Sequence, residues 1–186
     1  PNNMMLGDLQ NPYAMFTPTF YGMTNSQWQY YSWFWNDELV QYTTFSGGAT
    51  REENRYNIGE ANFASVWTGY ANRGTNIMHM IELAQKYNKP AAEAVGLTLK
   101  VLLMENLTAI YGDIPYKEAF RGRSEGITKP VFESQQEVYE DMLADLEKAN
   151  EIYAANPKTD AALGAVDQMY AGNLKQWRKF NNSLML

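Results

Sequence analysis

Residues 90–116 read PAAEAVGLTLKVLLMENLTAIYGDIPY, and this stretch decides the fold. Over Ala91–Tyr111 apolar side chains fall on nearly every side of a helix, a pattern typical of a helix buried between neighbours. Pro90 suits the first turn of that helix. Gly112 fits a left-handed C-cap, and Ile114 is held extended by the proline that follows it. The stretch therefore predicts a central buried helix that ends in a sharp stop.

Amphipathic patterns on both sides of this stretch predict two more long helices. Between Glu60 and Tyr87, apolar residues recur at spacings of three and four, which places them on one helix face. A very short connection joins this helix to the central one, so the two should lie antiparallel. Ser134 and Glu137 form an S-x-x-E capping box before a third apolar stripe. The stripe consists of Tyr139, Met142, Leu143, Leu146, Ala149 and Tyr153.

The remaining segments complete an all-α prediction. A fourth helix is expected from Leu174, and no strand alternation is visible. The first part of the chain is irregular and rich in aromatic residues, with short helices expected near Met4–Leu9 and Ser26–Leu39. We therefore predict a single domain with an aromatic-rich leader over residues 1–58 and helical hairpins over residues 59–186.

Composition argues against several classes of function. A net charge of −6 over 186 residues is unsuited to nucleic acid, and no apolar run reaches the length of a membrane span. The chain has no cysteine and a single histidine, His79, so thiolate sites and two-histidine metal sites are excluded. Phosphate-binding, dinucleotide-binding and hydrolase motifs are absent. We therefore expect that the protein has no enzymatic activity and binds neither a cofactor nor a metal ion.

Carboxylates on the third predicted helix are the one candidate for acid-base chemistry. A pair of carboxylates can act as general acid and base in sugar hydrolysis. These residues lie opposite the apolar stripe, so a solvated helix face is the preferred interpretation. They are Glu137, Glu140, Asp141, Asp145 and Glu147.

The leader contains the candidate ligand site. Six aromatic residues fall within positions 28–35 and would point to all sides of a helix, so they cannot all face one core. Exposed Trp and Tyr faces favour flat apolar ligand surfaces such as sugar rings, and neighbouring polar groups can bond hydroxyls. We predict ligand contacts at Trp33, Trp35 and Asn36. The alternative is that these aromatic residues pack against further protein.

Two sequence blocks carry a family resemblance. The first is YGDIPYKEA at 111–119, followed by PVFESQ at 130–135 and DLEKA at 145–149. The second is DQMYAGN at 167–173, followed by WRKFNNSL at 177–184. In this order they resemble the SusD/RagB family of glycan-binding surface lipoproteins of Bacteroidetes, and the resemblance covers roughly residues 60–186. The chain departs from the family pattern at two positions, Asn173 and Asn181, where Asp and Ala are usual.

The resemblance implies a tetratricopeptide-like scaffold in which helical hairpins bury their faces by stacking on one another. It also implies a surface protein of the outer membrane that captures oligosaccharides and passes them to a SusC-like TonB-dependent transporter. Family members are more than twice this length, so the chain is expected to be an N-terminal fragment. They are anchored through a lipidated N-terminal Cys, which is absent here, so a membrane anchor is implied by the resemblance alone. Structural roles are expected for Gly112, Pro115, Trp177 and Phe180, with glycan contacts in variable loops.

Two alternatives to glycan capture stay open. A helical-repeat adaptor that binds only proteins would use the same hairpins. An all-helical carbohydrate-active enzyme would depend on the carboxylates of the third helix.

Overall fold

The computed structural model describes residues 11–17, 19, 36–43, 56–57 and 60–186. The elements there are η2 (Pro12–Met15), α3 (Asp37–Leu39), α4 (Glu60–Lys86), α5 (Pro90–Tyr111), α6 (Gln135–Ala155), α7 (Ala161–Gly164) and α8 (Leu174–Leu184). No strand occurs in these ranges, which contain one isolated antiparallel bridge between Ile114 and Glu133. The all-α prediction is confirmed.

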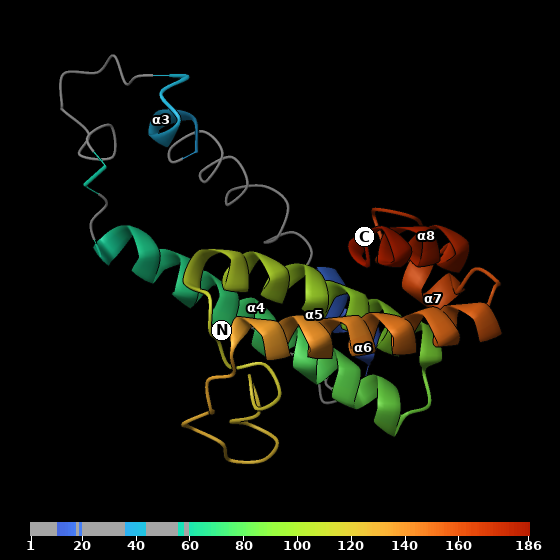
Figure 1. The fold of residues 1–186 in the computed structure, drawn as a ribbon. Coiled ribbons are helices and arrows are strands. Elements are labelled where there is room, and N and C mark those ends of the chain that lie inside the picture. The colour runs from blue at the N-terminus through green and yellow to red at the C-terminus, as the bar shows by residue number, and fades with distance from the viewer. Residues whose placement is uncertain (1–10, 18, 20–35, 44–55, 58–59) are drawn as a thin grey trace, which may run out of the picture.

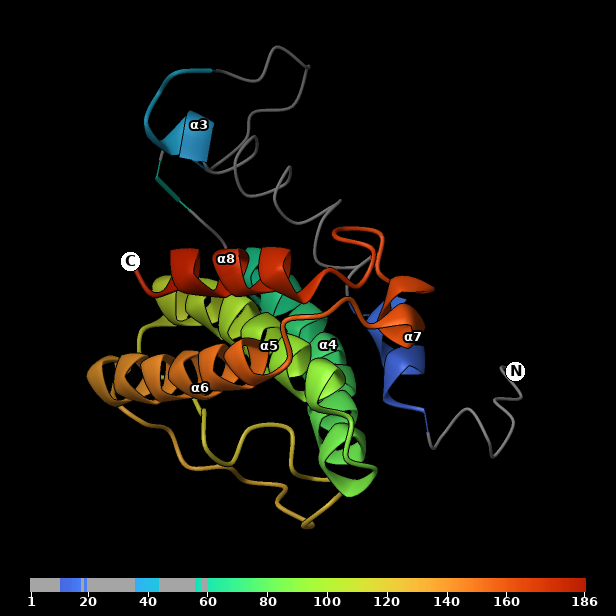
Figure 2. The ribbon, with the colours of Figure 1, turned by 90° about the vertical axis from the view of Figure 1, so that its right-hand side faces the viewer.

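The helices stack in chain order, as Figure 1 shows. The central helix α5 contacts α4 on one side and α6 on the other. The helix α8 packs on α6 and α5, and in Figure 2 it lies across them. The short connection at 87–89 makes α4 and α5 an antiparallel hairpin, as predicted. The three long helices α4, α5 and α6 thus bury apolar faces against their neighbours in sequence.

Local capping signals explain where the helices begin. Ser134 and Glu137 form the predicted capping box: the Glu137 carboxylate accepts from the Ser134 backbone N–H at 3.0 Å, and Ser134 Oγ accepts from the Glu137 N–H at 3.4 Å. Pro90 occupies the first turn of α5, where no intrahelical N–H is needed. Asn173 caps α8 by accepting from the N–H groups of Lys175 and Gln176.

The central helix α5 is more apolar than expected from the sequence. By length and composition α5 is able to cross a membrane, so the expectation that no segment reaches that length is wrong. In this structure 67% of its most apolar window is buried. Its flanking helices α4 and α6 account for that burial, so α5 serves here as the core helix of the stack.

The predicted apolar stripe of α6 is only partly correct. Tyr139 and Leu143 are each 42% exposed, whereas Val138, which lay outside the stripe, is fully buried. Among the described helices, α6 packs mainly on α5 and α8, so its buried face is narrow. A spacing of three and four fits the face that contains Val138 as well as the face that contains Tyr139 and Leu143. Which of these two faces is buried depends on the helices that pack against α6.

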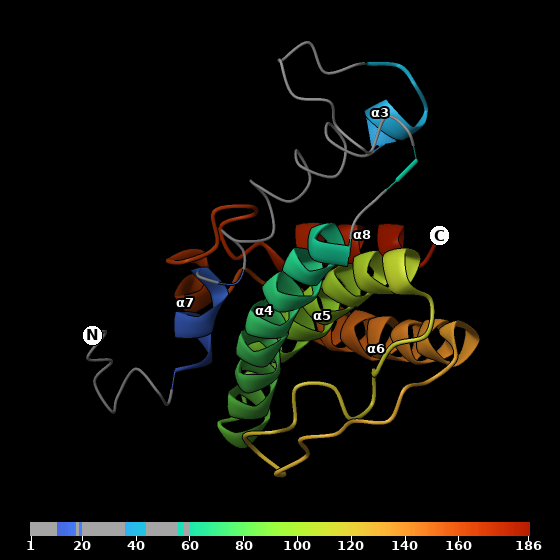
Figure 3. The same ribbon diagram turned by 90° about the vertical axis from the view of Figure 1, so that its left-hand side faces the viewer.

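Three short elements complete the description. Of the predicted helix over Ser26–Leu39, the described residues contain α3, while the helix predicted at Met4–Leu9 lies outside them. Neither η2 nor α7 was predicted from the sequence, and the two lie side by side in Figures 2 and 3. The Tyr13 hydroxyl of η2 donates to Asp160, the N-cap of α7, at 2.8 Å, and burial raises the pKa of that hydroxyl.

Candidate functional site

The turn at 111–116 is a structural joint between α5 and α6. Gly112 caps α5 with φ +73° and ψ −111°, so the positive φ is confirmed, but the backbone lies in the mirror-β region and not in the left-handed helical one. Its N–H donates to Thr108 O at 2.8 Å, and the Thr108 hydroxyl donates to Gly112 O at 2.6 Å. Asp113 accepts from the N–H of Gln135, the first residue of α6, at 2.9 Å.

Beyond the turn, the outgoing and returning segments of the 112–134 loop are hydrogen-bonded to each other. Glu133 donates its N–H to Ile114 O at 3.1 Å, and its carboxylate accepts from the N–H groups of Tyr116 and Lys117. Farther out, Glu118 accepts from the N–H of Val131 at 2.9 Å. The extended conformation predicted at Ile114 is confirmed by this pairing.

A partly buried cluster of Tyr116, Asp145 and Lys100 holds the turn against α6. The Tyr116 hydroxyl donates to Asp145 at 2.7 Å, and Lys100 of α5 pairs with the same oxygen at 2.8 Å. The Lys100 ammonium also lies 3.9 Å from the centre of the Tyr116 ring, a cation–π contact. Burial, then the charge of Asp145, raises the pKa of Tyr116. Asp145 is therefore a structural acceptor, which corrects the prediction that it belongs to a solvated face.

The second sequence block is equally structural. The Asp167 carboxylate accepts from the N–H groups of Met169, Tyr170 and Gly172, and from the indole of Trp177 at 2.7 Å. Trp177 is fully buried, and the ring of Phe180 meets it edge-on at 6.0 Å. These contacts confirm the structural role expected for this block.

The buried Asn181 does more than the sequence suggested. Its amide accepts from Thr98 Oγ1 at 2.9 Å and donates to Leu146 O at 2.9 Å, so it joins α8 to both α5 and α6. The Tyr153 hydroxyl lies 3.0 Å from Thr98 Oγ1. An Ala at this position, as in the family pattern, would carry none of these bonds.

Three aromatic side chains from separate elements gather beside the 112–134 loop. Trp67 comes from α4, Tyr111 from the end of α5 and Phe132 from the entry to α6. The rings of Trp67 and Phe132 are parallel to within 3°, with centroids 6.2 Å apart. Tyr111 meets Trp67 edge-on at 5.3 Å, and burial raises the pKa of its hydroxyl. Trp67 is 38% exposed and Phe132 60%, so the pair forms an aromatic shelf at the surface.

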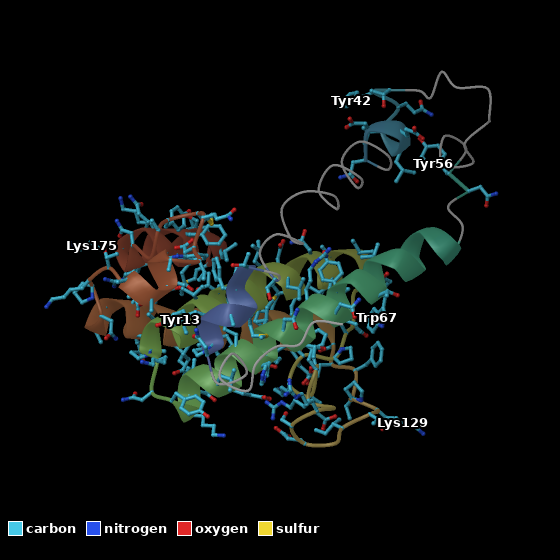
Figure 4. All side chains as sticks on the ribbon, turned by 180° about the vertical axis from the view of Figure 1, so that it is seen from behind. Tyr13, Tyr42, Tyr56, Trp67, Lys129 and Lys175 are labelled. Carbon is cyan, nitrogen blue, oxygen red and sulfur yellow. The ribbon has the colours of Figure 1, made fainter. Side chains whose placement is uncertain are left out.

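An apolar pocket of about 110 Å³ opens beside this shelf. Its wall includes Trp67, Tyr70, Met104, Leu107, Pro115 and Phe120. A Cβ at Gly74 would overlap the Phe120 ring, so the glycine lets this ring pack directly on α4. Figure 4 shows Trp67 on the side of the molecule that carries the loop, with Lys129 on that loop. The shelf and the pocket are thus parts of one surface feature, which the sequence analysis missed.

A second pocket lies between the start of α5 and the end of α6. It measures about 360 Å³ and is lined mainly by the segment 155–160, with Pro90 and Leu174. No aromatic side chain lines it, so it offers hydrogen bonds without a stacking surface. The shelf is therefore the better candidate for a sugar ring.

The predicted leader site is described at one position only. Asn36 is exposed and precedes α3, and its side chain makes no capping hydrogen bond there. Trp33 and Trp35 lie outside the described residues. The three residues therefore stay a prediction.

The acidic side chains of α6 were the candidates for acid-base chemistry, and a metal site would need clustered ligands. No group of three or more His, Asp or Glu side chains in those ranges is placed to hold a metal ion. Asp141 pairs with Lys117 at 3.0 Å, and Glu137 serves the capping box. Burial, then the charge of Arg123, lowers the pKa of His79. Four of the five candidate carboxylates of α6 thus have hydrogen-bond or ion-pair partners, namely Glu137, Glu140, Asp141 and Asp145.

Comparison with known proteins agrees with this architecture. Over residues 1–186 the chain matches the family described as "Starch-binding associating with outer membrane", SusD-like_2. A comparison with curated proteins gives no match. The family match extends over the leader, beyond the blocks that carried the resemblance.

Solved structures share the fold at low sequence identity. A SusD homolog from Bacteroides fragilis is 23% identical with a TM-score of 0.74, and the match covers 94% of this chain and 34% of that one. A chitin-binding protein is 24% identical with a TM-score of 0.76, covering 94% and 37%. A chitin-binding SusD homolog from Flavobacterium johnsoniae is 22% identical with a TM-score of 0.69, covering 93% and 37%. The chain therefore spans about a third of the length of these relatives.

Stacked helical hairpins and a pinned turn after the central helix define a tetratricopeptide-like scaffold of the kind that the SusD homologs share. The chain belongs to the SusD-like family.

Proposed function

We propose that this protein binds oligosaccharides at the cell surface and delivers them to a SusC-like TonB-dependent transporter of the outer membrane. The observation that carries the proposal is the family match over the whole chain, with its starch-binding and outer-membrane description. Two fold relatives are named for chitin binding, which supports a glycan ligand. Binding needs no acid-base pair, so we also propose that the protein turns over no substrate.

The ligand should extend over several sugar units. Stacking on one aromatic ring contributes roughly 0.5–1.5 kcal/mol beyond area burial, whereas micromolar binding requires about −8 kcal/mol. Several rings and hydrogen-bonding groups must therefore act together. We propose that Trp33, Trp35 and Asn36 of the 1–58 leader contribute, and that the shelf of Trp67 and Phe132 is a further stacking surface.

Titration of the full-length protein with maltoheptaose, triacetylchitotriose and cellotriose tests the binding step. Tryptophan fluorescence should change for at least one of these glycans, with a saturable curve. Trp33→Ala and Trp35→Ala should weaken that binding if the leader is a site. Absence of any response across a wide glycan panel, with calorimetry in agreement, contradicts the proposed function.

Delivery requires a physical partner. The full-length protein, isolated from outer membranes in mild detergent, should bring a TonB-dependent transporter with it, and a lipid anchor would hold it at that surface. If the protein is isolated without a transporter from membranes that contain one, delivery is contradicted. The proposal of glycan binding is not affected by that result.

A protein-only adaptor is the second candidate, and the surface of α6 favours it. Tyr139 and Leu143 lie four residues apart on one helix face, and both are 42% exposed. Exposed apolar side chains at this spacing suit a partner helix. If Tyr139→Ala and Leu143→Ala abolish partner capture while no glycan binds, the adaptor replaces the leading proposal.

An enzymatic function has its own test. If incubation with a polysaccharide releases products, and Glu140→Gln or Asp141→Asn stops the release, the protein is an enzyme and our proposal is wrong.

A further inference from the structure

The pocket beside the aromatic shelf has a chemistry that limits what can enter it. The residues lining it are apolar or aromatic, and none carries a charge or an amide. A hydroxyl moved from water into such a space loses its hydrogen bonds, which is unfavourable. Most substituents of a sugar ring are hydroxyls, so an ordinary glucose unit would be kept out of the pocket.

The shelf places a stacked sugar ring next to that pocket. Trp67 belongs to both features, since its ring lines the pocket and lies parallel to the exposed ring of Phe132. A sugar that stacks on the exposed part of Trp67 therefore lies next to the pocket. The volume of about 110 Å³ accepts a small group and not a second sugar unit.

We infer that this pocket receives a methyl-terminated substituent of the bound glycan, and that the protein therefore prefers sugars carrying an acetyl group or a 6-deoxy methyl group. The inference rests on the proposed function, because it assigns a subsite to the same glycan. Transfer of one or two carbon groups from water into an apolar pocket is favourable, whereas a hydroxyl at the same place is not. The pocket thus favours glycans that carry an apolar substituent over glycans that carry a hydroxyl at that position.

Three ligands and the full-length protein test the inference by calorimetry. Triacetylchitotriose carries acetyl groups, cellotriose has the same β-1,4 linkage with hydroxyls in their place, and a rhamnose trisaccharide carries the 6-deoxy methyl. Wild-type protein should bind one of the two methyl-bearing sugars about four- to tenfold more tightly than cellotriose. The better of these two identifies the source of the methyl group.

Two variants and two matched controls locate the preference. Ala71 lines the pocket and is exposed on α4, so Ala71→Leu fills the space without disturbing the core. It should abolish the preference, so that the methyl-bearing sugars and cellotriose bind with similar affinity. Phe132→Ala removes one ring of the shelf and should weaken all binding by about three- to tenfold. Ala144→Leu and Tyr139→Ala, at exposed positions of α6, should change neither quantity.

The outcomes separate the inference from the proposed function. If the protein binds glycans with no preference for a methyl group, or if Ala71→Leu keeps that preference, the inference is overturned and the function stands. If no glycan binds at all, the function fails and the inference with it.

Discussion

The indole nitrogen of Trp177 donates a 2.7 Å hydrogen bond to the carboxylate of Asp167, ten residues earlier in the chain, and both side chains are buried. One carboxylate therefore fixes both the turn that precedes α8 and the orientation of the largest buried side chain of α8. Because the Asp167 oxygens also accept three backbone N–H groups, the bond is part of a network and not an isolated pair.

Removal of this carboxylate should loosen α8. Asp167→Ala leaves three backbone N–H groups and one indole N–H without their acceptor, which should lower the free energy of unfolding by about 2–4 kcal/mol. Urea denaturation measures the loss, and hydrogen exchange should accelerate in α8 first. Gln168→Ala, at the exposed neighbouring position, serves as the control. A loss below about 0.5 kcal/mol would show that water replaces the carboxylate.

The Thr98–Asn181 pair should show strong coupling. Thr98→Val leaves Asn181 Oδ1 without its donor, and Asn181→Ala removes the bonds to both Thr98 and Leu146. Each single change should cost about 1–3 kcal/mol. The double variant should cost less than the sum, because the unpaired buried atom created by one change is removed by the other. Additive losses in urea denaturation would mean that the two residues act independently.

The capping box should make stability depend on acid pH. Hydrogen bonds from the side chain and then the backbone of Ser134 lower the pKa of Glu137 below its ordinary 4.5. A lowered folded pKa means that the stabilisation is fully present above about pH 4.5 and is lost as the pH falls through the folded value. The difference in unfolding free energy between wild type and Glu137→Gln should therefore shrink below about pH 4.5. A difference that stays constant as the pH falls well below about 4.5 would contradict this prediction.

The Gly74–Phe120 contact should reverse the usual effect of a glycine substitution. In a helix interior, Gly→Ala normally stabilises by roughly 1 kcal/mol. At Gly74 the new methyl overlaps the Phe120 ring, so Gly74→Ala should instead destabilise, by about 1–2 kcal/mol net. Thermal or urea unfolding measures the change. In a Phe120→Ala background the same substitution should become stabilising, and persistent destabilisation there would exclude the ring as the cause.

Local signals in the sequence were enough to predict the long helices α4, α5 and α6. The bounds of α4, α5 and α6 follow from features confined to a few residues, such as Pro90 and the Ser134 capping box, and they agree with the structure to within about one residue. Such signals act through the backbone of the helix itself, so they do not depend on the rest of the fold.

Tertiary features could not be predicted in this way. The exposure of Tyr139 and Leu143 depends on which helices cover α6, and helical spacing alone does not contain that information. The shelf joins Trp67 to Phe132 across 65 positions of sequence, and its parallel geometry arises only when the 112–134 loop folds back. A sequence search for clustered aromatic residues leads instead to the leader, whose Trp33 and Trp35 lie outside the described residues.

The loop over residues 112–134 has its ends fixed independently of its tip. Hydrogen bonds close the base of the loop: they join Asp113 to Gln135, Glu133 to Tyr116 and Lys117, and Glu118 to Val131. Every residue of Gly122–Gly126 at the tip is exposed. Lengthening a loop whose base is already closed costs only about 0.6 kcal/mol for each doubling of its length. The tip is therefore a suitable place to insert an epitope or a fluorophore tag, which would report on this surface in living cells without disturbing the helices.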